Sequence, residues 1–179
     1  GQAVPASFAG GMFLAGIGLV AFAAVRPLRG ALGQRRPQIE FAYVVALANV
    51  AVGATIATLL MGGNTAVGTA WGALKPAHAW LNLVGFAGLV IVASLIHLAP
   101  TVAGSRLRPR ASGRLAVVGV ALGAPLVATG YATGLDVVAR AGALAVVAGA
   151  LGVAAHGVAV HPDLERGRWT SDLGWHRFT

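Results

Sequence analysis

Five long apolar runs constrain this chain more than any other feature. They cover residues 4–25, 41–60, 78–99, 115–134 and 137–160, and Arg140 is the only charged side chain within them. Each run is close to the ~20 residues that a helix needs to cross a bilayer. With 57% apolar and 10% charged residues, the composition is that of a chain whose main solvent is lipid. The sequence predicts an all-α integral membrane protein, one transmembrane domain over residues 1–179 with about five helices.

Basic residues are distributed unevenly between the two ends of these runs. Eleven of the 13 Lys and Arg residues follow the first, third and fifth runs: Arg26, Arg29, Arg35, Arg36, Arg106, Arg108, Arg110, Arg114, Arg166, Arg168 and Arg177. Short loops rich in Lys and Arg stay on the cytoplasmic side of a membrane. We therefore expect the N-terminus outside and the C-terminus in the cytoplasm. The net charge of +8 reflects this topology and does not indicate a nucleic-acid partner.

Several functional classes are disfavoured by the residues present. There are no cysteines, which excludes disulfides and thiolate metal ligands. The middle of each run has no carboxylate or basic side chain, so an ion-coupled transporter is the third choice among functions. No motif of a soluble enzyme is present. The chain begins at Gly1 without a methionine, and we expect a signal or an upstream stretch of a longer chain before it.

His78 opens the third run, with Asn82 and Gly85 following at helical spacing. These three residues share one helix face, which offers an imidazole ligand, a polar neighbour and flat space for the edge of a porphyrin. The alternative is that His78 and Asn82 only cap and hydrate a helix end at the membrane surface. His78 and Asn82 are therefore candidate cofactor-binding residues.

Two further histidines lie near the cytoplasmic ends of their runs. His97 follows His78 by 19 positions, roughly 28 Å along a helix, so the two cannot share one metal. His97 and His156 are at matching depth, and Ala148 and Gly152 precede His156 on one face, which we expect to leave room for a planar group. The pair could be axial ligands of one haem b or ligands of a copper ion. The alternative is two interfacial histidines without a cofactor.

Glycines recur at spacings that let helices approach closely in lipid. The pairs are Gly119 with Gly123, Gly130 with Gly134, and Gly149 with Gly152. The fourth and fifth runs are separated only by a turn around residues 134–136, which predicts a tight helical hairpin. The Gly-rich segment 62–75 is expected to be a loop between the second and third helices.

The stretch His-Ala-Trp-Leu-Asn-Leu-Val-Gly-Phe-Ala-Gly-Leu from His78, followed by Ser-Leu-Ile-His-Leu-Ala-Pro-Thr from residue 94, carries a family resemblance. It resembles a helix of the membrane region found ahead of multicopper oxidase or copper nitrite reductase domains in high-GC bacteria. More loosely, it is similar to helices of the haem-copper oxidase and NnrS groups. The resemblance implies a multi-pass protein of the bacterial plasma membrane, with His78 and Asn82 at the matched polar positions. The chain has no cupredoxin-like sequence, a departure from that family.

These observations favour a membrane-embedded redox module, an electron-transfer unit that binds haem b, with copper as the second choice of cofactor. It would serve a respiratory oxidoreductase domain or subunit, with quinol as a candidate electron donor. The alternative function is a cofactor-free structural or anchor subunit of a larger membrane complex, held by its glycine-rich helix faces. Haem absorbance would distinguish the two.

Overall fold

The computed structural model describes residues 5–28, 37–102 and 111–160, and helices make up 94% of it. The elements are α1 (Ala6–Leu28), α2 (Pro37–Met61), α3 (Thr65–Thr69), α4 (Trp71–Ala79), the π-helix η1 (Trp80–Gly88), α5 (Leu89–Val102), α6 (Ala111–Thr133) and α7 (Asp136–Ala159). No strand occurs in these described ranges. The predicted all-α class is therefore confirmed.

Four helical stretches of the described chain are long and apolar enough to cross a membrane. They are Pro37–Met61, Trp71–Pro100, Ala111–Thr133 and Asp136–Ala159. Within α1, the apolar part Ser7–Ala23 is shorter than the other four. Four of the five predicted runs thus coincide with helices of spanning length, and the fifth span remains a prediction for α1.

The segment between α2 and α4 differs from the loop predicted over residues 62–75. Gly63 has a φ of +78°, and the N–H of Asn64 donates to the Leu59 carbonyl at 3.0 Å, so α2 ends in a left-handed turn that glycine tolerates. The side-chain oxygen of Asn64 then accepts a bond from the N–H of Val67 at 3.1 Å and caps α3. The third long helix therefore begins at Trp71, seven residues before the predicted start.

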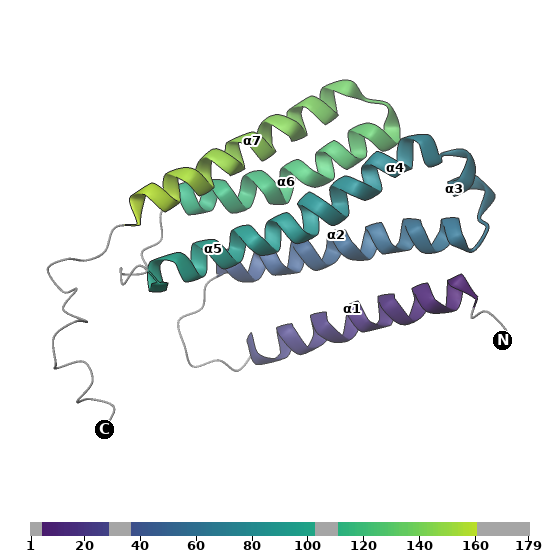
Figure 1. Cartoon of the computed structure of the whole chain (residues 1–179), viewed down its shortest axis with the longest axis horizontal. Coiled ribbons are helices and arrows are strands. Elements are labelled where there is room, and N and C mark those ends of the chain that lie inside the picture. Colours follow the sequence, from purple (N-terminus) through teal and green to yellow (C-terminus); the bar gives the residue numbers. More distant parts are fainter. Residues whose placement is uncertain (1–4, 29–36, 103–110, 161–179) are drawn as a thin grey trace, which may run out of the picture.

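The long helices run alternately up and down, with α1 and α7 on opposite sides of the bundle (Figure 1). Among the described residues, α1 packs only against α2, whereas α6 contacts α2, α4, η1, α5 and α7. Consistent with this central place, α6 is the most buried of the four long apolar stretches. The ends of α1, α5 and α7 lie at the same side of the bundle (Figure 1).

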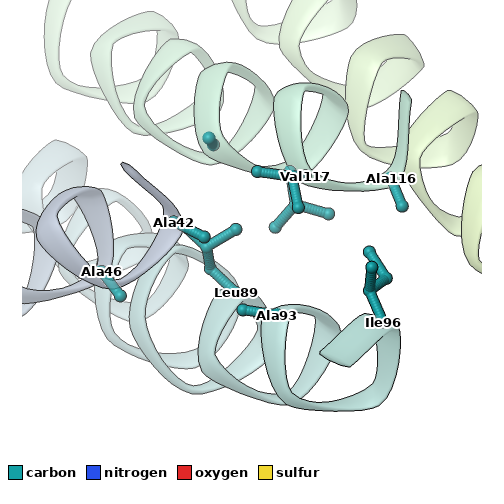
Figure 2. Packing of buried hydrophobic residues seen from close by; sticks show 9 residues of the cluster. Ala42, Ala46, Leu89, Ala93, Ile96, Ala116 and Val117 are labelled. Carbon is teal, nitrogen blue, oxygen red and sulfur yellow. The ribbon is translucent and has the colours of Figure 1, made fainter. Parts of the chain in front are cut away.

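The main core lies where α2, α5 and α6 meet. Small side chains Ala42 and Ala46 from α2 face Leu89 and Ala93, and Val117 of α6 closes the cluster (Figure 2). Leu89 and Val117 are fully buried. Alanines allow the backbones to approach closely, which is how helices associate when lipid is as apolar as their side chains.

The predicted tight hairpin is formed by α6 and α7. A Cβ atom on Gly119 would lie 2.7 Å from the Cα of Gly149, and one on Gly152 would lie 2.7 Å from the backbone nitrogen of Ala116. Gly123 and Gly130 meet α7 equally closely. The predicted packing roles of these glycines are therefore confirmed.

Gly134 differs from its predicted packing partner Gly130. It has a φ of +73° and no atom within 4 Å of an added Cβ. The N–H of Leu135 donates to the Gly130 carbonyl at 3.0 Å, so Gly134 closes α6 in a left-handed turn and does not serve as a packing surface. Its role is to let the chain reverse before α7.

Candidate cofactor site at His78

The candidate site is built on a π-helical segment inside the third long helix. At the end of η1, the N–H of Leu89 bonds to the carbonyls of Phe86 and Val84, and not to that of Gly85 four residues earlier. The carbonyl of Gly85 instead accepts a bond from Nδ2 of Asn49 on α2, at 3.0 Å. The change of helical register thus turns a backbone acceptor toward a neighbouring helix.

In the contact between α2 and η1, an asparagine of each helix packs against a glycine of the other. Asn49 lies over Gly85, where an added Cβ would be 2.8 Å from the Cγ atom of Asn49. Asn82 lies over Gly53, where an added Cβ would be 2.8 Å from the Cγ atom of Asn82. Each carboxamide therefore occupies space that only glycine leaves open on the opposite helix.

His78 is tied to the same contact through one ring nitrogen. Its Nδ1 atom lies 2.9 Å from the carbonyl oxygen of Gly53 and 3.2 Å from Nδ2 of Asn82. The carbonyl can only accept, so the shorter contact requires a hydrogen on Nδ1. Nδ2 of Asn82 also donates to the carbonyl of His78 itself at 2.8 Å. In this tautomer Nε2 carries the lone pair, which is the state in which an imidazole binds a metal.

A cavity of about 430 Å³ lies beside His78. Its floor is α2, at Val50, Ala54, Ala57, Thr58 and Met61. One wall is His78 and Asn82, and the other is Ala9, Gly10 and Phe13 of α1. Since α1 makes no packing contact with α4 or η1 in the described chain, the cavity is a slot between them. Its volume lies within the roughly 300–1,000 Å³ typical of ligand pockets.

The structure places two of the three residues of the predicted porphyrin face beside one cavity and corrects the role of the third. His78 and Asn82 both line the cavity. Gly85 does not offer flat space, because the side chain of Asn49 covers it. The alternative, in which His78 caps a helix end, does not fit either, because His78 lies well inside a helical stretch that begins at Trp71. The Trp71 ring packs near the imidazole, with centroids 6.1 Å apart.

The contact between α2 and η1 contains one polar residue that the sequence interpretation missed. Asn49 is 5% exposed and lies in the middle of the run 41–60. Asn49 precedes Gly53 by four positions, and Asn82 precedes Gly85 by three. This similar spacing was the signal in the sequence that could have indicated the contact. A buried amide in an apolar helix needs a partner, and a glycine on a neighbouring helix is the place where one can reach the backbone.

His97 and His156 lie at the end of the bundle opposite His78. His156 is 5% exposed, and a Cβ atom on Gly113 would lie 3.3 Å from both its Nδ1 atom and the Cγ2 atom of Ile96. Gly113 therefore lies against both His156 and Ile96. His97, the next residue after Ile96, is turned about 100° from Ile96 around the helix axis. A shared haem or copper at His97 and His156 stays a prediction.

Gly152 does not leave open the space that was expected beside His156. Gly152 lies against the backbone of α6, where an added Cβ would be 2.9 Å from the Ser112 carbonyl oxygen. The small residue serves helix packing and leaves no room there for a planar group. No group of three or more His, Asp or Glu side chains in the described ranges could hold one metal ion. His161 and His176 lie outside the described residues.

Searches of protein-family models, of curated proteins and of solved structures give no match to this chain. The resemblance of the stretch 78–101 to the membrane region of bacterial copper enzymes therefore stays an expectation from sequence. The assignment of a function depends on the geometry around His78.

Proposed function

We propose that this chain is a membrane-embedded redox module in which the imidazole of His78 would hold a haem b. One observation carries the proposal: His78 lines an apolar slot while its Nδ1 atom is held by the Gly53 carbonyl at 2.9 Å, which leaves Nε2 for ligation. A backbone carbonyl on the second nitrogen is the common way in which proteins fix the orientation of a ligating imidazole.

The residues around the slot fit a planar, largely apolar group. Ala54 and Ala57 form a low floor, Gly10 and Ala9 keep the α1 wall shallow, and Phe13 adds an aromatic face. When bound, haem would supply one-electron redox chemistry. The chain's own residues would orient it, exclude water and provide a low-dielectric surrounding for the iron ligand. Copper is the less favoured cofactor, because His78 is the only histidine that lines this cavity within the described chain.

We place the module in the bacterial plasma membrane as a multi-pass protein, with the N-terminus outside and the C-terminus cytoplasmic. Four apolar helices of spanning length and the distribution of basic residues support this placement. The three helices that the basic segments follow, α1, α5 and α7, all end at one side of the bundle (Figure 1). Electrons would pass between quinol and an oxidoreductase partner, with the lipid bilayer as the surrounding phase.

The test is a reduced-minus-oxidised difference spectrum, with haem and metal analysis, of the purified full chain. We expect a haem b signal that is lost in His78→Ala and kept in His97→Ala and His156→Ala. If instead the His97 and His156 variants lose it and His78→Ala keeps it, the cofactor lies at the other end of the bundle. If the unaltered protein contains no haem, the redox function is wrong and the anchor alternative remains.

A further inference from the structure

We infer that Asn49 is a positioning residue that sets which nitrogen of the His78 ring carries the hydrogen. Asn49 is not among the residues that line the slot, and it acts through the helix contact that holds the Gly53 carbonyl in place. Asn49 would thus be a second residue that determines ligation at the proposed haem site, and this role in ligation rests on the proposed function. The tautomer itself is a property of the protein without cofactor.

Two groups compete for Nδ1 of His78, and they demand opposite tautomers. The Gly53 carbonyl, at 2.9 Å, accepts a hydrogen from Nδ1. Nδ2 of Asn82, at 3.2 Å, is a donor and would bond to an unprotonated Nδ1. In that second state the ring hydrogen would be on Nε2, and Nε2 could no longer bind a metal. The position of the Gly53 carbonyl therefore decides whether the imidazole is ready to ligate.

Asn49 controls that position because it fixes α2 against η1. Its carboxamide donates to the Gly85 carbonyl at 3.0 Å, and it lies four residues, about one turn, before Gly53 on the same helix. The bonds from Asn49 to Gly85 in η1 and from His78 in α4 to Gly53 both join α2 to the third long helix. A slide or rotation of α2 that broke the first bond would also move the Gly53 carbonyl away from Nδ1. Asn82 lies on the same long helix as His78 and bonds to the His78 carbonyl, so it would remain beside the ring.

The test reads the ring hydrogen directly by ¹⁵N NMR of the full chain, labelled at histidine, in lipid nanodiscs without added haem. We expect the His78 hydrogen on Nδ1 in the unaltered protein and transferred wholly or partly to Nε2 in Asn49→Leu. Thr55→Val is the matched control on α2, because the Thr55 hydroxyl bonds only to its own helix, at Ala51 O. The control should keep the hydrogen on Nδ1.

Further variants separate a positioning role from a general packing role. Asn82→Leu removes the rival donor and should leave the hydrogen on Nδ1. Gly85→Ala keeps Asn49 but places a Cβ 2.8 Å from its Cγ atom, so it should shift the tautomer as Asn49→Leu does, and it replaces that variant if Asn49→Leu does not fold. A hydrogen on Nε2 in the unaltered protein would overturn the inference, as would an unchanged tautomer in a folded Asn49→Leu or Gly85→Ala. A protein without haem would refute the proposed function and leave this result standing.

Discussion

Nδ1 of His78 lies 2.9 Å from the carbonyl oxygen of Gly53, and Gly53 also receives the side chain of Asn82 in the space where a Cβ would be. The same glycine therefore provides both the acceptor for the ring and the clearance for its neighbour. This double use of one backbone position makes the contact between α2 and the third long helix sensitive to a single methyl group.

Gly53→Ala should weaken this contact and remove the haem that we propose. The added Cβ would overlap the Asn82 carboxamide, and overpacking a well-packed interior costs about 1–3 kcal/mol. Thermal unfolding in detergent and haem content check the result. Gly72→Ala, in an exposed part of α4 with no atom within 4 Å of an added Cβ, is the control and should keep both properties. Full haem occupancy in a folded Gly53→Ala would contradict the expectation.

The α1 wall of the slot can be tested with two adjacent glycines. Gly10→Val should separate α1 from α2, because an added Cβ at Gly10 would meet the Thr58 side chain, with Cβ atoms 2.8 Å apart. Gly11→Val should be tolerated, since nothing lies within 4 Å there. Hydrogen exchange should rise over α1 only in the Gly10 variant, and haem should be bound more weakly. Equal exchange in the two variants would show that this contact does not hold α1.

The α6 and α7 hairpin predicts opposite effects for two glycines of the same helix. Gly152→Ala should lower the melting temperature, because its Cβ would lie 2.7 Å from the backbone nitrogen of Ala116, which cannot rotate away. Gly157→Ala meets no atom within 4 Å and should raise stability slightly, since alanine is favoured over glycine in helices by about 1 kcal/mol. A stabilised Gly152→Ala would refute the close packing of this hairpin.

The hydrogen bond between Tyr43 and Ser94 joins α2 to α5 at 3.0 Å between their hydroxyl oxygens. A double-mutant cycle with Tyr43→Phe and Ser94→Ala should give a coupling of about 0.6 kcal/mol, the average for polar contacts between membrane helices. Unfolding in a denaturing detergent measures the four stabilities. Additive effects would mean that the bond contributes nothing measurable to the helix contact.

The proposed orientation is testable because the chain has no cysteine of its own. A cysteine at the exposed position of Gly68 in α3 should react with a membrane-impermeant reagent added outside intact cells. A cysteine at Gly104, in the Arg-rich segment after α5, should react only after the cells are permeabilised. The reverse labelling pattern would overturn the orientation.

The helical runs and the hairpin were predictable from local sequence. Runs of apolar residues of spanning length fold as helices because no water is available to pair their backbones, whatever their neighbours are. Gly134 and Asp136, separated only by Leu135, likewise indicate a turn, and the small residues Gly119 and Gly149 indicate a close contact between consecutive helices. The prediction of a loop over residues 62–75 was wrong, because Asn64 caps a new helix, α3, within this segment.

The candidate site could be predicted only in part. His78 and Asn82 were visible as polar residues at helical spacing, but their partners come from another helix. The bond from Asn49 to Gly85 spans 36 positions, and the carbonyl that receives it is offered by a π-helical register that no local pattern revealed. Helical periodicity gives the residues on one face, whereas the rotation and register between two helices decide which groups meet. That choice depends on packing over the whole bundle, so only the tertiary structure showed that Gly85 is covered and that Gly53 holds the imidazole of His78.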